Sequence, residues 1–305
     1  MCDRRAFVTG MVAASAFAGA GLGAKAQSGT PRLPVVATFA ILADFVAQVG
    51  GERIGLTALV GPGGDAHVYS PTPADSRSLA AARLVFVNGL GFEGWVSRLI
   101  ASSGTRATVV TATSGIKPLK AETAGHSHSH GEVDPHAWQS VPNAKVYVAN
   151  IAAALTAADP AGKDGYEARA KAYTTELDAL DADIRAAIAS IPAGRRKIIT
   201  SHDAFQYFEK AYGIDFAAPR GLSTSAEPSP QAVGRIIRQI KAEKIPAVFI
   251  ENLSDERLMK RIADETGAKM GGTLYPDTLT PAGGAAPTYV AMMRHNLAQI
   301  IAALA

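Results

Sequence analysis

The chain has 305 residues, its hydrophobic fraction is 48%, and its formal net charge is +3. That hydrophobic fraction is typical of a globular protein. Arg4, Arg5 and Lys25 against Asp3 account for +2 of the charge, so the chain after residue 26 carries only +1. This balance, with no basic patch interleaved with aromatic side chains, excludes a nucleic-acid-binding protein. The remaining roughly 280 residues suffice for a large core or for two domains.

Residues 1–26 have the pattern of a cleaved export signal. Arg4 and Arg5 precede an apolar run over 7–22, and Ala24-Lys25-Ala26 matches a small-x-small cleavage site. We therefore expect a periplasmic protein that begins near Gln27, exported by the twin-arginine or the general secretory route. The alternative is an uncleaved anchor, although the run is short and rich in Gly and Ala for a membrane span.

Cys2 is the only cysteine, and it lies ahead of the apolar run. A cysteine that receives a lipid would follow that run, so we expect no lipid anchor and no disulfide. Any metal site must then use His, Asp or Glu side chains.

The first half of the mature chain alternates apolar strand patterns with helical patterns. Strands are expected at 34–39, 54–60, 84–88 and 107–110, and helices at 41–49, 72–82 and 92–102. Thr72-Pro73 suits the N-cap and first position of the second helix. Continuous apolar strands separated by helices predict an α/β fold with a mostly parallel sheet flanked by helices.

The second half repeats this plan after a long helical stretch. Strands are expected at 197–200, 247–250 and 269–274, and helices at 203–212, 231–244, 254–266 and 287–304. Residues 163–190 predict one helix of about 40 Å. We therefore expect an N-terminal lobe (27–160), a rigid linking helix (161–191) and a C-terminal lobe (192–305). The alternative is that this helix packs within a single domain.

Four side chains that can bind a metal lie at matched points of the two halves, after strand patterns or in turns that open helices. They are His67, His136, His202 and Asp277. Three imidazoles and one carboxylate complete a tetrahedral set for Zn²⁺. Ligand sites of open α/β sheets form at the carboxyl ends of strands. Each residue alone could equally be a surface or turn residue, and no pair has the i, i+4 spacing of a helical zinc motif.

Several neighbours of these four could support them. Asp134 could orient an imidazole or be a turn residue, and Trp138 could wall the site from water. Glu227 could face the cleft between the lobes or serve a turn or helix cap, and the same two interpretations apply to Glu251. His295, in the last helix, is expected to have a structural or surface role.

The positive end of a helix after His202 predicts a lowered pKa that keeps this imidazole neutral and available as a ligand. Asp203 is then expected to be an N-terminal charge of that helix.

Residues 124–132 form a His-rich loop that contains His126, His128 and His130. Gly, Ser and His dominate it, which is typical of a surface loop. We expect a weaker, auxiliary zinc site there. The alternative is a flexible loop with incidental histidines.

Several segments resemble one family of receptors: DPHAW around His136, SHDAFQYFEKAYGI at 201–214, LSTSAEPSP at 222–230 and YPDTL around Asp277. From about Pro34 to its end, the chain is similar to the periplasmic solute-binding proteins of zinc and manganese ABC transporters, the TroA-like metal receptors. The ending PAGGAAPTYVAMMRHNLAQI most resembles the AztC-type zinc receptors.

The resemblance implies two α/β lobes bridged by one long helix, with the metal in the cleft between them. The family's ligand positions fall on His67, His136, His202 and Asp277. Manganese-preferring relatives tend to carry Glu at the third position and zinc-preferring ones His, so His202 supports zinc. The resemblance also implies an ABC permease and its ATPase as partners. A periplasmic zinc metallochaperone is a further candidate partner, and we expect a monomer.

We therefore expect a periplasmic Zn²⁺ receptor that catalyses no reaction. The alternatives are a manganese receptor of the same family and a secreted zinc hydrolase, which would use Asp277 as a base and keep a water on the metal. Some relatives have been linked to cell adhesion. We consider an adhesin less consistent with a cleaved signal that lacks a lipid-accepting cysteine.

Overall fold

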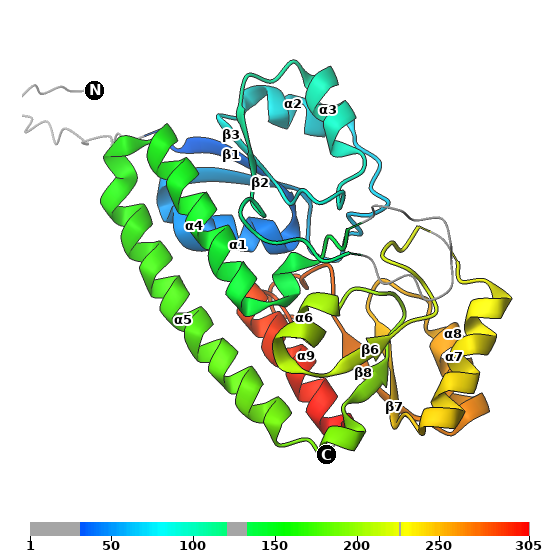
Figure 1. The fold of residues 1–305 in the computed structure, drawn as a ribbon. Coiled ribbons are helices and arrows are strands. Elements are labelled where there is room, and N and C mark those ends of the chain that lie inside the picture. The colour runs from blue at the N-terminus through cyan, green and yellow to red at the C-terminus, as the bar shows by residue number, and fades with distance from the viewer. Residues whose placement is uncertain (1–30, 121–132, 226, 305) are drawn as a thin grey trace, which may run out of the picture. The chain divides into compact units, whose positions relative to one another are not determined.

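Two four-stranded sheets, one from each half of the chain, form the frame of the molecule (Figure 1). The computed structural model describes residues 31–120, 133–225 and 227–304. All strands are parallel, in the order β2-β1-β3-β4 in the first sheet and β6-β5-β7-β8 in the second. The same order occurs twice, so the expected α/β class with parallel sheets and flanking helices is confirmed.

The first half contributes the elements β1 (Leu33–Phe39), α1 (Ala40–Gly50), β2 (Ile54–Val60), α2 (Pro73–Ala81), β3 (Leu84–Val87), α3 (Val96–Ser103), β4 (Thr108–Thr111) and α4 (Val141–Ala158). The long helix α5 (Lys163–Ala189) follows. The second half contributes β5 (Lys197–Ile199), α6 (Gln206–Tyr212), β6 (Asp215–Ala217), α7 (Pro230–Glu243), β7 (Ala247–Glu251), α8 (Glu256–Thr266), β8 (Lys269–Leu274) and α9 (Tyr289–Leu304).

Most elements begin and end where the sequence predicts them, because their boundary chemistry is local. Thr72 caps α2 in a capping box with Asp75, and Pro73 occupies the first helical position. Helix α3 begins at Val96, later than expected, because the chain still turns at residues 92–95, after three residues of positive φ at 89–91. Strand β6, only three residues long, was missed.

Helix α5 runs beside both halves of the molecule (Figure 1). Its 27 residues span about 40 Å. Leu177, Leu180, Ile184 and Ile188 are buried at helical spacing, so one apolar stripe faces the core. The helix contacts α1 and α4 of the first half and α6 and α9 of the second. The exact limits of the two lobes remain a prediction.

The main hydrophobic core is continuous between the two halves. It includes both sides of the first sheet and the buried residues of α5, α6 and α9. A smaller hydrophobic cluster packs α7 and α8 against β5 and β7 of the second sheet. Its members include Ile236, Ile240 and Met259. The second lobe is therefore joined to the first by packed side chains along the α5 and α9 side.

The N-terminus of α9 is held by the first helix of the fold. The backbone N–H of Tyr289 donates to Asp44 of α1 over 2.8 Å. Burial raises the pKa of the Asp44 carboxyl, and this bond with Tyr289 opposes that rise.

Within the described residues, no helix has both the length and the apolarity needed to cross a membrane.

Candidate metal centre

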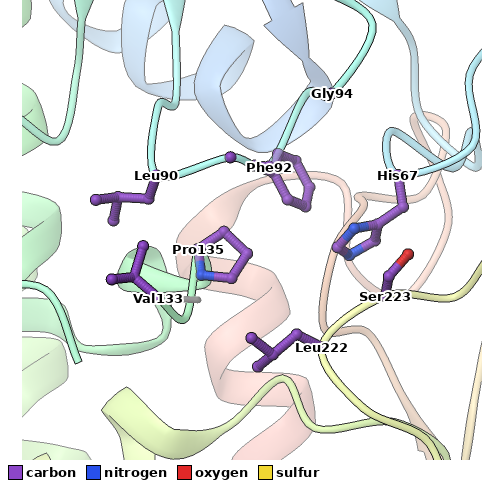
Figure 2. Close-up of a pocket in the computed structure, with 9 residues that line it drawn as sticks. His67, Leu90, Phe92, Gly94, Val133, Pro135, Leu222 and Ser223 are labelled. Atoms are coloured by element: carbon purple, nitrogen blue, oxygen red, sulfur yellow. The ribbon is translucent and has the colours of Figure 1, made fainter. Parts of the chain in front are cut away.

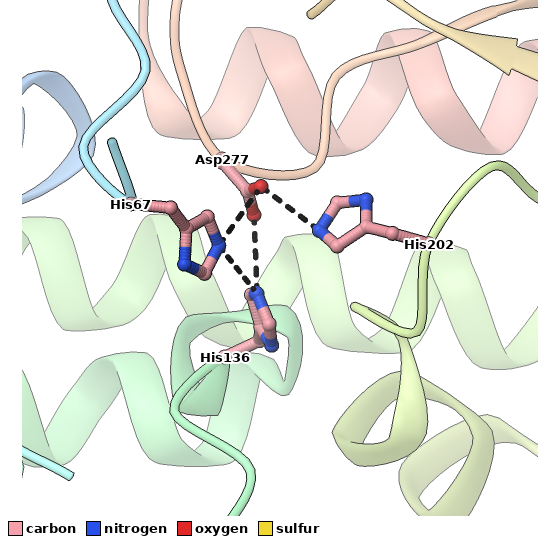
Figure 3. Close-up of side chains that lie close together, drawn as sticks. All are labelled: His67, His136, His202 and Asp277. Atoms are coloured by element: carbon pink, nitrogen blue, oxygen red, sulfur yellow. Dashed lines mark hydrogen bonds and ion pairs between the residues drawn. The ribbon is translucent and has the colours of Figure 1, made fainter. Parts of the chain in front are cut away.

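The structure brings His67, His136, His202 and Asp277 into one cluster (Figure 3). His67 lies in the loop after β2, and His136 in the turn that precedes α4. His202 and Asp277 lie in the turns after β5 and β8. Each residue offers a ligand atom, and the four atoms all lie within 4.8 Å of one another. The first half supplies two of them and the second half the other two.

The ligand positions are only partly matched between the halves, contrary to the expectation of equivalent points. His136 and Asp277 each follow the fourth strand in the order of their sheet. His67, in contrast, follows the edge strand β2, whereas His202 follows the interior strand β5. The two lobes therefore reach the same cluster from different strand ends.

The distances between ligand atoms suit a small tetrahedral ion. A zinc ion with bonds of about 2.0–2.1 Å separates its ligand atoms by about 3.3 Å. The Nε2 atoms of His67 and His136 lie 3.3 Å apart. Asp277 oxygens lie 3.5 Å from His67 Nε2, 3.5 Å from His136 Nε2 and 3.0 Å from His202 Nε2. All three imidazoles turn the same ring nitrogen toward one point.

His136 is fixed by Asp134 and by aromatic packing. One oxygen of the Asp134 carboxylate lies 2.8 Å from His136 Nδ1 and accepts the His136 backbone N–H at the same distance. The ring centroid of Trp138 lies 5.3 Å from that of His136, and the Trp138 indole is fully buried. Asp134 therefore has both roles that the sequence left open: it shapes the turn and directs Nε2 toward the cluster.

His202 has its own buried carboxylate, that of Glu251 at the end of β7. Glu251 accepts the backbone N–H groups of Ser201 and His202 over 3.0 and 3.1 Å with one oxygen, and His202 Nδ1 bonds to the other. Both side chains are 1% exposed. Glu251 thus directs Nε2 of His202 toward the cluster, as Asp134 does for His136.

The expected lowering of the His202 pKa was wrong. Burial does lower the pKa of this imidazole, but the Glu251 and Asp277 carboxylates raise it by more, to well above its usual value. Helix α6 begins at Gln206, so its positive end lies beyond the His202 turn. Asp203, expected in the first turn of that helix, precedes it and accepts a hydrogen bond from Gln206.

Asp277 is a buried anion that faces the three imidazoles. Burial raises the pKa of its carboxyl, but His202 and His136 lower it by more, so the net shift is well below the usual value. Within the described residues, both Asp277 oxygens and His202 Nε2 are buried, and although they contact one another they make no well-formed hydrogen bond. Buried polar atoms are normally satisfied, so these three atoms point to a ligand for which the cluster is prepared.

The His67 ring packs against an aromatic side chain. Its ring centroid lies 4.6 Å from that of Phe92, in an edge-on contact. The neighbouring Glu93 is buried and accepts the backbone N–H groups of Asn88 and Gly89, which fixes the loop that carries Phe92. Neither Phe92 nor Glu93 was singled out from the sequence, because both were predicted to lie in a helix and not in a loop.

A cavity of about 500 Å³ opens beside His67 (Figure 2). Both halves of the chain line it, mostly with apolar side chains: Leu90, Phe92, Val133, Pro135, Leu222 and Ser223. Of the four clustered side chains, only His67 lines this cavity. The His67 side of the cluster is therefore the side nearest to open space.

The remaining predicted residues lie elsewhere. Glu227 does not face the cluster, because its side chain is 83% exposed and pairs with Arg220 at the surface. His295 lies 3.0 Å from the Thr273 carbonyl and packs against Tyr275. His126, His128 and His130 lie outside the described residues.

The family model described as zinc-uptake complex component A, periplasmic (ZnuA), matches residues 35–303. The chain belongs to this family. It is a periplasmic or extracellular metal-binding receptor of an ABC transporter, and it works with a permease and an ATPase. Members of this family are substrate-binding receptors and not enzymes, so the hydrolase interpretation is set aside.

Individual members of the family are named for different metals. The chain is 33% identical over 284 residues to the manganese ABC transporter substrate-binding lipoprotein PsaA of Streptococcus pneumoniae, covering 91% of each chain. It is similar to the solved periplasmic zinc-binding protein TroA of Treponema pallidum, with a TM-score of 0.83, 32% identity, and 90% and 100% of the chains covered. A manganese-bound periplasmic metal-binding protein of Candidatus Liberibacter asiaticus gives a TM-score of 0.80, 31% identity, and coverage of 89% and 99%.

These findings confirm the family resemblance and the two-lobed fold. They stand against one expectation, because PsaA and the metal receptor ScbA of Streptococcus cristatus are named lipoproteins, whereas no lipid anchor was expected here.

Proposed function

We propose that this receptor captures Zn²⁺ with His67, His136, His202 and Asp277 and delivers it to the permease of an ABC importer. The observation that carries the proposal is the cluster of three imidazoles and one carboxylate, whose ligand atoms lie within 4.8 Å of one another and make contacts as short as 3.0 and 3.3 Å. Four protein ligands fill the coordination sphere of zinc and leave no position for a reactive water. Such a site is suited to carrying an ion.

The choice of zinc over manganese rests on donor chemistry. Imidazole suits zinc, whereas manganese prefers carboxylate, carbonyl and water oxygens. The outer carboxylates of Asp134 and Glu251 bond Nδ1 of His136 and His202 and so direct both Nε2 atoms toward the ion. His202 is the decisive position, since replacing it by Glu would give a site of two imidazoles and two carboxylates.

Metal analysis of protein purified from the periplasm tests this proposal, followed by competitive titration with Zn²⁺ and Mn²⁺. We expect about one zinc per chain. His202→Glu should weaken zinc binding and raise the relative affinity for manganese. His295→Glu makes the same chemical change outside the cluster and should leave both affinities unchanged. Manganese as the dominant native metal would overturn the zinc assignment.

The His-rich segment offers a second, smaller proposal. We infer that His126, His128 and His130 form a weaker auxiliary zinc site that collects ions, including those from a periplasmic metallochaperone, for a monomeric receptor. Deleting residues 126–130 should lower zinc stoichiometry at high zinc and slow loading from a donor protein. Unchanged stoichiometry and loading would contradict the collector role.

A further inference from the structure

The three histidines of the cluster are supported unequally. His136 and His202 each have a buried carboxylate on Nδ1, from Asp134 and Glu251. Within the described residues, no carboxylate bonds to Nδ1 of His67, whose ring makes its polar contacts through Nε2. His67 also lies in a glycine-rich loop and lines the open cavity. Besides the edge contact of its ring with Phe92, its position depends on hydrogen bonds to its backbone.

Asp65 provides that support. One of its carboxylate oxygens accepts the backbone N–H of His67 over 2.9 Å. The other oxygen accepts the hydroxyl of Thr224, which belongs to the second half of the chain, over 2.7 Å. Asp65 therefore connects the placement of one metal ligand to a contact between the two halves.

Thr224 lies in a segment that also reaches the ligand turn of its own half. We name residues 221–225 the bridging segment. At one end, the Gly221 carbonyl accepts the backbone N–H of Asp203, the residue after His202. Near the other end, Thr224 bonds Asp65, and between them Leu222 and Ser223 lie beside His67 in the cavity wall (Figure 2). The bridging segment thus links the His202 turn to the His67 turn.

We propose that Asp65 and Thr224 are positioning residues that hold His67 on the bound ion, so that their hydrogen bond sets the rate of metal release. This inference rests on the proposed function, because it assumes that the four clustered residues bind the metal. The bond is partly buried and lies at the cavity side, where water can replace it when the halves separate. His67 then becomes the first ligand to leave, while the carboxylate-supported imidazoles keep their orientation.

The test is the rate of zinc dissociation from the zinc-loaded protein into excess EDTA, followed by stopped flow. Thr224→Ala should raise this rate roughly three- to tenfold, the factor that corresponds to one hydrogen bond. The association rate should change much less. Thr224→Ser keeps the hydroxyl and should restore a rate close to that of the wild type, which general loosening of the segment would not predict.

Ser225→Ala is the matched control, because the Ser225 hydroxyl bonds only Ser223 within the described residues and does not touch Asp65. It should release zinc at the wild-type rate. A wild-type rate in Thr224→Ala, or equally fast release by Thr224→Ser, would overturn the positioning role. Failure of the wild-type protein to bind zinc would instead overturn the proposed function, so the two failures are distinguishable.

Discussion

The two sides of the metal cleft are held together by different means. On the buried side, the Trp138 indole and the Gln139 amide both donate to the Pro276 carbonyl, over 2.8 and 2.7 Å. The Tyr289 hydroxyl donates to the Trp138 carbonyl over 2.7 Å. These bonds lie inside the continuous core, where an unmade hydrogen bond costs about 1–3 kcal/mol.

Around the loop that carries His67, the halves meet through partly buried contacts. Besides the bond between Asp65 and Thr224, the Gly63 backbone N–H donates to the Leu279 carbonyl over 2.9 Å. Water can satisfy these groups when they part, so separation there costs far less than on the Trp138 side. From this comparison we expect the cleft to open at His67 and to turn about its buried side.

Replacing His136 and His67 in turn is the strongest way to break this comparison. Either change to Ala removes a ligand and should weaken zinc binding by more than the roughly 10- to 100-fold that losing an outer carboxylate costs. His136→Ala should also lower the melting temperature of the metal-free protein by more than His67→Ala does, because it leaves the buried Asp134 carboxylate without its imidazole partner. Calorimetric titration and thermal scans without metal measure the two effects.

His295→Ala provides the control for this pair, since that imidazole lies outside the cluster and should leave zinc affinity unchanged. Equal losses of metal-free stability in His136→Ala and His67→Ala would show that the two sides are held alike.

Glu251→Gln should have the next largest effect. The amide keeps the size of the side chain but removes the charge that directs and activates His202. We expect zinc affinity to fall roughly 10- to 100-fold. Glu227→Gln removes the same charge at an exposed position and should change nothing. Wild-type zinc affinity in Glu251→Gln would show that His202 needs no buried carboxylate.

A smaller effect should appear as the pH changes. Burial lowers the pKa of His202, but Glu251 and Asp277 raise it by more, so its folded pKa lies well above the unfolded value of about 6.5. Its protonation therefore stabilises the metal-free protein fully below about pH 6.5, and this contribution is lost as pH rises through the folded pKa. Zinc displaces that proton, so zinc affinity should rise with pH, by at most about tenfold per unit for one proton.

The depressed pKa of Asp277 acts in the opposite sense. Its contribution is present above about pH 3.9, the unfolded value, and is lost as pH falls through the folded pKa.

Thermal scans test the effect of His202. Because zinc displaces the His202 proton, the gap in melting temperature between zinc-loaded and metal-free protein should widen from pH 6 to pH 8. A constant gap over this range would contradict a raised pKa for His202.

The sequence predicted best what depends on local pattern. Strand β8 has the predicted bounds, and α5 lies within the predicted helix, because apolar spacing determines both. Strand β6 was missed because Asp215–Ala217 is too short to show a period, and it is specified by pairing with β5. The late start of α6 also depends on tertiary contacts, since Glu251 takes the backbone N–H groups before it.

The candidate site shows the same division. Turn chemistry and the family resemblance pointed to His67, His136, His202 and Asp277, which the fold brings together. Their supports could not be assigned in the same way. Glu251 lies 49 residues from His202, and Thr224 lies 159 residues from Asp65. Such pairs become visible only when the strand order is known.

The contact between Asp44 and the start of α9 affects when the protein can complete its folding during synthesis. The two partners are 245 residues apart in the sequence. A chain that is synthesised from its N-terminus cannot form this contact until Tyr289 has been added. Contacts between such distant residues slow folding. The first lobe therefore stays incomplete until α9 docks, and losing the sixteen residues of this helix, Tyr289–Leu304, would expose the core of both lobes to aggregation and proteolysis.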